Sequence, residues 1–276
     1  MQAQELHCKI VSIGTWGSHF EDWDALKSLL LGSDTPTDKL KGPKPQVIPA
    51  NERRRAPLPV RLAVESSWQA TQEIDLDPNE LTCVFVSGLG DTDLTDYMCK
   101  VLASENKELS PTKFHNSVHN APAGYWTIST KSMGAANSIA GFEQSVSLTL
   151  MEALIQCEVE KTPILVTLYD APVSTVLRPL LENEEPFALS LVIVPQDHKA
   201  NGIALRGKVN SGGDTSWPKL NSSNTFLQSL YQTNPSAKIL SLVEMIANQN
   251  SCDMSITMPL SSGSSITFSL NEDSHG

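Results

Sequence analysis

Side chains that could act as nucleophiles or metal ligands are few and widely spaced in this chain. The five cysteines form no Cys-x-x-Cys pair: Cys8, Cys83, Cys99, Cys157 and Cys252. Their odd number, and the apolar surroundings of Cys83 and Cys157, favour buried free thiols in a reducing compartment. A disulfide framework or a zinc site is therefore not expected.

Two histidines have the spacing of a metal pair on a helix, because His119 follows His115 by four residues. No third ligand is evident nearby, so polar contacts with a neighbouring helix or a partner are the better interpretation. The acidic residues between Asp91 and Asp96 lack the glycine and glutamate of a calcium loop. A helix N-terminus, which favours acidic side chains, explains them better. We predict no metal and no other cofactor.

Hydroxyl and glycine motifs also give weak signals. Ser87, Ser145 and Ser147 could each be proposed as a hydrolase nucleophile, but no Gly-x-Ser-x-Gly motif surrounds them. Gly88 and Gly90 form only a fragment of a dinucleotide-binding fingerprint. Neither motif predicts an activity.

Composition limits the class of protein. A chain of 276 residues, 40% of them apolar, can bury one large core or two small ones. It has no apolar run long enough for a membrane span and no N-terminal signal pattern, so we expect a cytoplasmic protein. The net charge of −11 disfavours nucleic acid and anionic lipid as partners. Trp68 and Trp126 are accordingly expected to pack in the interior rather than stack on bases.

Near-continuous apolar strands alternate with helices, which predicts an α/β layered domain. The predicted strands cover residues 9–13, 81–87, 163–169 and 187–194. The predicted helices cover residues 23–30, 58–72, a segment capped by Asp91 or Thr92, a segment opened by Ser110 and Pro111, and residues 144–157. Beyond residue 195 we predict a long polar connection over 208–236, a helix over 239–247, and short strands over 254–258 and 265–270.

Three helices have an expected apolar face. In the helix that starts near Asp91, the face consists of Leu94, Tyr97, Met98, Val101 and Leu102. In the helix that starts at Pro111, it consists of Phe114, Val118 and Ala121. In the helix over residues 144–157, it consists of Leu148, Met151, Leu154 and Ile155.

Residues 110–128 resemble the ketosynthase segment that precedes the nucleophile. The segment is most similar to the abridged β-ketoacyl synthase-like family of chain-length factors in aryl polyene and related polyketide systems. Residues 51–55 resemble the arginine element near the start of ketosynthases, and Tyr169 with Asp170 also fits. The resemblance implies a single ketosynthase-like unit over residues 1–276 with a thiolase-like α/β/α layered fold. Its N-terminal half, 1–195, would be complete, and its C-terminal half, 196–276, would be abridged.

The family places its nucleophilic cysteine at a tight strand-to-helix turn, where free backbone N–H groups stabilise a thiolate. The stretch from Gly141 to Gln144 is similar to the Gly-Glu-Gln of type II chain-length factors. The resemblance therefore puts Gln144, with neighbours Phe142 and Glu143, at a degenerate nucleophile position. A carboxamide has no thiolate form and cannot hold an acyl chain as a thioester. The alternative is that Gln144 is an ordinary polar start of a helix.

Ketosynthases also need two histidines from their second half. Beyond residue 195 this chain has only His198 and His275, and neither lies in a Gly-His-x-x-Gly context. The resemblance thus implies a non-catalytic chain-length factor that pairs with a catalytic ketosynthase through residues 110–126 and 134–141. It would shape the acyl tunnel, with these residues at the tunnel or interface: Phe114, His115, Val118, His119, Tyr125, Trp126, Ala136, Asn137, Ile139 and Phe142.

Arginine suits phosphate, so Arg53, Arg54 and Arg55 are candidate contacts for an acyl carrier protein or its phosphopantetheine arm. Pairing with some of the chain's 31 carboxylates is the preferred alternative. Two other functions stay open. One is a malonyl-carrier-protein decarboxylase that supplies primers, although such proteins retain the missing histidines. The other is a scaffold that only solubilises the ketosynthase.

Overall fold

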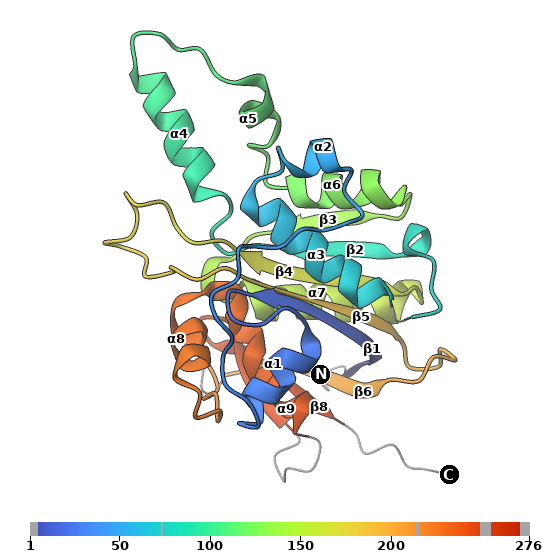
Figure 1. Ribbon diagram of the computed structural model, residues 1–276. Helices are drawn as coiled ribbons and strands as arrows, with labels where there is room; N and C mark the ends of the chain where they lie inside the picture. The colour runs from blue at the N-terminus through green and yellow to red at the C-terminus, as the bar shows by residue number, and fades with distance from the viewer. Residues whose placement is uncertain (1–4, 73, 213–215, 249–254, 271–276) are drawn as a thin grey trace.

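A single eight-stranded sheet forms the centre of the protein in a computed structural model that describes residues 5–72, 74–212, 216–248 and 255–270 (Figure 1). The strand order is β3-β2-β4-β5-β1-β6-β8-β7. The strands are β1 Glu5–Gly17, β2 Thr82–Val86, β3 Ala136–Ile139, β4 Ile164–Asp170, β5 Phe187–Pro195, β6 Ile203–Ser211, β7 Ser255–Ser261 and β8 Ser264–Leu270. β2 runs parallel to β3 and β4, and the other pairings are antiparallel.

Helices cover both faces of the sheet. They are α1 Trp23–Leu30, α2 Ala50–Arg53, α3 Leu58–Gln72, α4 Thr92–Ala103, α5 Pro111–His115, α6 Ala121–Thr130, α7 Ser145–Glu160, α8 Thr225–Thr233 and α9 Leu240–Ala247. One apolar core lies between the sheet and α3 and α6, and a larger one lies between the sheet and α1, α7, α8 and α9. This arrangement is the predicted α/β/α layering. None of the described helices is long and apolar enough to cross a membrane.

Helix α3 approaches the sheet unusually closely. A Cβ atom on Gly14 of β1 would lie 2.2 Å from the carbonyl oxygen of Ser66, so only glycine fits there. Hydroxyl pairs link the helix to the strands beneath it: Ser66 to Ser190 at 2.8 Å and Ser67 to Thr167 at 2.7 Å. The polar groups buried at this contact are therefore satisfied, as buried polar groups must be.

The structure confirms the predicted strands and most helices, with one large correction. Residues 208–236 are not a polar connection, because β6 extends to Ser211 and α8 lies within the segment. The side chain of Asn224 caps α8 by accepting hydrogen bonds from the backbone of Phe226 and Leu227. The sequence pattern did not predict β6, because polar and apolar residues alternate along it, as in a strand with one face toward water.

Two helices bury a different face from the predicted one. Within α4 only Leu94 is buried, and Leu102 is 53% exposed because the helix projects from the body of the protein (Figure 1). Within α7 the buried face includes Val146, Leu150 and Leu154, whereas Ile155 is exposed. Apolar residues surround much of α7, so their spacing alone could not show which side packs.

The described strands after residue 195 (β6, β7 and β8) continue the same sheet, and the boundary at residue 195 stays a prediction. The β6-β8-β7 end packs one face against the larger core. Its other face carries linked polar side chains, with Thr267 at 2.8 Å from Thr257 and 2.9 Å from Asn210. That face is suited to water.

Candidate functional site

A strand-to-helix turn joins β3 to α7, as predicted. One 3-10 turn, Phe142–Gln144, separates Ile139 at the end of β3 from Ser145 at the start of α7. Phe142 has a φ of +49°, a left-handed conformation that costs energy for a bulky residue. The backbone N–H of Gly141 donates to the Ser145 hydroxyl at 3.0 Å, which closes the turn.

The side chains at this turn offer no nucleophile. Phe142 and Glu143 are exposed, and Gln144 stands directly before α7 without a side-chain cap hydrogen bond. A phenyl ring, a carboxylate and a carboxamide cannot form a thioester. Buried Ser145 and Ser147 lie in the first turn of α7, where Ser147 donates to the carbonyl of Pro259. The turn therefore joins a strand to a helix without presenting a thiol.

Gly88 packs closely against the turn between β3 and α7. A Cβ atom there would lie 2.9 Å from the carbonyl oxygen of Phe142 and 2.6 Å from Cβ of Pro235. Gly88 is thus required for close packing and not for binding a dinucleotide.

Asp170, at the end of β4, organises the same region and is fully buried. Its Oδ1 accepts hydrogen bonds from the Ser87 hydroxyl at 2.6 Å and the Leu89 N–H at 2.9 Å. Its Oδ2 accepts from the Ser236 hydroxyl at 2.7 Å, the Ser236 N–H at 3.1 Å and the Gly88 N–H at 3.2 Å. Burial raises the pKa of the Asp170 carboxyl, and these hydrogen bonds oppose that shift. Sequence reasoning assigned no role to Asp170, although a carboxylate closing an apolar strand was a usable signal.

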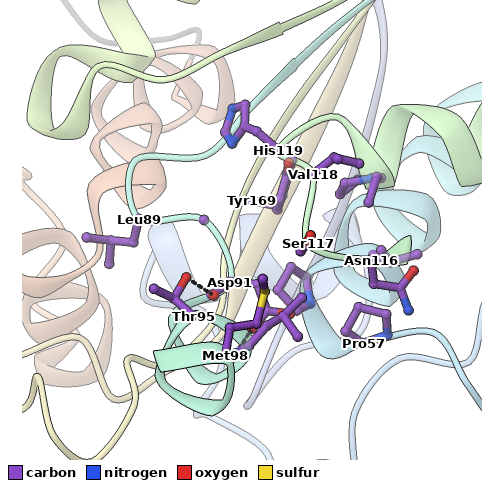
Figure 2. A pocket seen from close by; sticks show the side chains of 16 residues that line it. Pro57, Leu89, Asp91, Thr95, Met98, Asn116, Ser117, Val118, His119 and Tyr169 are labelled. Carbon is purple, nitrogen blue, oxygen red and sulfur yellow. Dashed lines mark hydrogen bonds between the residues drawn. The ribbon is translucent and has the colours of Figure 1, made fainter. Parts of the chain in front are cut away.

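A cavity of about 220 Å³ lies beside this network, between α3, α4 and the segment joining α5 to α6 (Figure 2). Its lining residues are Pro57, Pro59, Val60, Leu89, Gly90, Asp91, Leu94, Thr95, Met98, Asn116, Ser117, Val118, His119, Ala121, Pro122 and Tyr169. Asp91 caps α4 by accepting from the Leu94 N–H at 2.9 Å, as predicted. A hollow of about 360 Å³ shares Asn116 with the cavity, and one of about 610 Å³ shares Val118.

Most of the predicted tunnel or interface residues gather around β3 and the α5–α6 segment. Phe114 and Val118 are exposed, as are Ala136 and Asn137 on β3. His115 and Tyr125 line the hollow of about 610 Å³, and Ile139 is half-buried. Trp126 is the exception, because it is fully buried in the core under α6. It packs there, as expected for its apolar ring, and cannot line an interface.

The predicted histidine pair does not share a helix. α5 ends at His115, and α6 begins only at Ala121, because Pro122 suits a first helical turn and cannot continue a preceding helix. His119 lies between them, with Nε2 at 2.9 Å from the Ile139 carbonyl oxygen. Within the described ranges, no cluster of three histidine, cysteine or acidic side chains could hold a metal.

The arginine run contacts neighbouring segments, and the charge of Arg53 also acts on the Glu65 carboxylate, so pairing with carboxylates stays a prediction. Arg53 donates to the Pro45 carbonyl and to Oε1 of Gln46, both at 3.0 Å. No ion pair joins Arg53, Arg54 or Arg55 to another described residue, and Arg54 and Arg55 are exposed.

Among the described thiols, Cys99 is exposed and the other three are buried. Cys8, Cys83 and Cys157 are buried and free, as expected for the last two. Burial raises the pKa of Cys83 and of Cys157 to about 12, and that of Cys8 further, so none forms a thiolate readily. His198 lies after β5, where its Nδ1 accepts from the Ala200 N–H. Cys252 and His275 lie outside the described residues.

Comparison with solved structures shows the same fold in ketosynthase complexes. A chain of the complex of AntDE with the type II polyketide synthase acyl-carrier protein AntF is 12% identical, with a TM-score of 0.72. A chain of the ketosynthase ApeO in complex with its chain length factor ApeC from Xenorhabdus doucetiae is 16% identical, with a TM-score of 0.68. A chain of the ishigamide ketosynthase/chain length factor is 11% identical, with a TM-score of 0.67. Each match covers 96% of this chain and 99% of the other.

Identities this low establish the fold alone, and no curated protein matches the sequence. The sequence itself matches the family described as beta-ketoacyl synthase, N-terminal domain, over residues 23–271. That match covers most of the chain and includes the turn between β3 and α7. The chain therefore belongs to the β-ketoacyl synthase family, through that family's N-terminal domain.

Proposed function

We propose that the protein is a non-catalytic chain-length factor that pairs with a catalytic β-ketoacyl-carrier-protein synthase and shapes its acyl tunnel. The turn from Gly141 to Gln144 carries the proposal. It provides the strand-to-helix geometry of a nucleophile site but places Phe142, Glu143 and Gln144 where the chemistry needs a thiol. Among the described residues, no cysteine lines the neighbouring cavity, and His119 is the one histidine that does.

A partner-binding surface lies at the same end of the sheet. β3 is an edge strand, so one row of its backbone N–H and C=O groups has no strand beside it. Large apolar side chains near it are exposed: Phe114 by 59%, Val118 by 53%, Ile128 by 73% and Met133 by 92%. We call these four residues and β3 the β3 face. A partner chain would bury them, and solved complexes of this fold contain a ketosynthase.

The cavity beside Leu89 supports steric control of chain length. Leu94, Met98 and Val118 form part of its wall, and Phe142 stands exposed at the nearby turn. Forcing an extra methylene into a filled site costs about 1–3 kcal/mol. That penalty slows elongation roughly tenfold or more. The exposed Arg54 and Arg55 remain candidate contacts for the carrier protein that delivers the chain.

Co-expression with a catalytic ketosynthase tests the proposal. We expect a 1:1 complex whose products become longer when Phe142→Ala enlarges the tunnel. Val159→Ala is the matched control, because Val159 is an exposed apolar residue near the other end of α7. A stable monomer, with product length unchanged by Phe142→Ala, would contradict the proposal.

The two alternatives give different outcomes in the same experiment. A decarboxylase would release carbon dioxide from malonyl-carrier protein as an isolated chain. A pure scaffold would form the complex but leave product length unchanged in every variant of the β3 face and of Phe142.

A further inference from the structure

Positive charge is concentrated in the segment that leads from α1 through α2 into the first turn of α3. Seven of the chain's 20 lysines and arginines, but only one of its 31 acidic residues, lie within residues 39–61. We call residues 39–61 the basic segment. Its seven cations are Lys39, Lys41, Lys44, Arg53, Arg54, Arg55 and Arg61. Such a block of one charge in an otherwise acidic chain is typical of a surface that binds a partner.

Little of this charge is neutralised by described residues. Lys39 pairs with Glu185 at 2.8 Å, and the charge of Arg53 acts on the Glu65 carboxylate. Four exposed cations form no ion pair with another described residue: Lys41, Lys44, Arg54 and Arg55. These four side chains can therefore meet the charge of a partner without breaking a contact within the chain.

The backbone of the basic segment is packed against the body of the protein. Arg61 donates to the Pro43 carbonyl at 3.3 Å, and Arg53 donates to the Pro45 carbonyl at 3.0 Å. Pro43, Pro45 and Ile48 are buried. The exposed cations are thus presented from a backbone that is already ordered, which lowers the entropy cost of docking.

The arrangement of the four cations fits an acidic protein surface better than a single phosphate. A phosphate site needs several donors that converge on one group. Lys41 and Lys44 instead lie before α2, and Arg54 and Arg55 lie after it. Of the four, only Arg55 lines a hollow described above.

Nucleic acid fits the basic segment less well than an acidic protein. Duplex DNA carries a charge about every 1.7 Å along its axis, so its charge would extend beyond the segment. There it would meet the rest of a chain whose net charge is −11. A small acidic protein can place its carboxylates on the segment alone, because salt screens its other charges beyond about 10 Å.

The basic segment adjoins the β3 face. Figure 1 shows α2 beside α6, and Arg55 lines the hollow of about 610 Å³ together with Val118 and Ile128. We propose that the basic segment docks an acidic protein surface through its four unpaired exposed cations. The inference rests on the proposed function for the identity of that partner, which is the carrier protein that delivers the acyl chain.

Calorimetric binding of two forms of a carrier protein to the isolated protein tests this surface. The probes are the apo form, which lacks phosphopantetheine, and the holo form of the acyl carrier protein that serves the partner ketosynthase. Both forms should bind with similar affinity, because the basic segment contacts the protein surface and not the arm. Added salt should weaken the binding of both, since it screens exposed charges.

Two double variants locate the contact. Lys41→Gln with Lys44→Gln, and Arg54→Gln with Arg55→Gln, should each weaken binding of the apo form roughly threefold to tenfold. Both double variants should keep the melting temperature of the wild type, because all four side chains are exposed.

Lys107→Gln with Lys199→Gln is the matched control. Both lysines are exposed, lie outside the basic segment and form no ion pair with another described residue. This double variant changes the net charge by the same amount and should keep the affinity of the wild type. An equal loss of affinity in the control would overturn the inference, because binding would then respond only to net charge.

Three other outcomes would also overturn the inference. If only the holo form binds, and only the Arg54 and Arg55 double variant weakens it, the arginines hold the phosphate of the arm. If a short DNA duplex binds more tightly than the apo carrier protein, the segment binds nucleic acid. If neither form of the carrier protein binds, the segment docks no such partner.

Failure of this inference can be told apart from failure of the proposed function. A 1:1 ketosynthase complex with control of product length, but no loss of carrier binding in either double variant, removes only the docking surface. Carrier binding that both double variants weaken, in a protein that forms no ketosynthase complex, supports the docking surface and removes the proposed function.

Discussion

The two ends of the sheet differ in how they meet their surroundings. At one end, β3 is a short edge strand beside four exposed apolar side chains. At the other end, β7 carries Pro259, whose carbonyl accepts a hydrogen bond from Ser147 of α7. Proline and polar side chains protect an edge strand from pairing with another chain. The edge strand β7 therefore carries protection against pairing with another chain, whereas the edge strand β3 carries exposed apolar side chains beside it.

This difference changes the expectation that an abridged second half would leave apolar surface uncovered. Every large apolar side chain found exposed in the described residues comes from before residue 195. The described part of 196–270 exposes none, and its open face carries Thr257, Thr267 and Asn210 instead. The exposed apolar surface of the described residues therefore lies before residue 195, and four of its side chains, Phe114, Val118, Ile128 and Met133, belong to the β3 face.

The largest expected effect concerns the buried carboxylate behind the β3 face. Asp170→Asn would put an NH₂ group against the N–H donors of Gly88 and Ser236, leaving donors unpaired. We expect the free energy of unfolding to fall by about 3 kcal/mol. Urea denaturation measures it. Glu5→Gln is the control, because the half-buried Glu5 forms only long ion pairs, with Arg206 at 3.4 Å and Lys208 at 3.5 Å, and its loss should hardly change the midpoint. Equal midpoints for Asp170→Asn and wild type would show that Asp170 does not hold the region together.

The next effect compares the ends of the sheet in binding. Val118→Asp and Ile128→Asp each place a charge on the β3 face, where burial by a partner would desolvate it. We expect each to weaken ketosynthase binding tenfold or more, about 1.4 kcal/mol, as measured by calorimetry. Thr257→Asp at the exposed β7 end is the matched control and should bind normally. If the control weakens binding and the β3-face variants do not, the partner covers the opposite end.

The sequence predicted the layers of the fold because apolar periodicity is strong in the buried strands. β4 and β5 are buried along their whole length, and both were expected. The sequence did not predict β6, because polar and apolar residues alternate in that strand and the segment is rich in asparagine and serine. It did not predict the exposed face of α4, because the spacing of apolar residues shows that a helix has an apolar stripe but not whether that stripe is covered.

The candidate site was predictable in part for similar reasons. The turn at Gln144 follows from local sequence and the resemblance, so its place between β3 and α7 was correct. The separation of His115 from His119 depended on where a proline begins α6, which spacing alone did not settle. The role of Asp170 depends on contacts between segments far apart in sequence, because Ser87 and Ser236 both donate to its carboxylate. No local pattern records such contacts.

The smallest expected effect concerns the polar face at the β7 end. Thr267→Val would remove the hydroxyl that joins Thr257 and Asn210, while keeping a branched side chain suited to a strand. Because cross-strand pairs contribute roughly 0.2–1 kcal/mol, thermal unfolding should shift only slightly, and ketosynthase binding should not change. Ile266→Thr, at the neighbouring and fully buried position, is the contrasting variant and should destabilise far more. A large loss of stability from Thr267→Val would mean that this face is covered, and that the β7 end, like the β3 end, meets another chain.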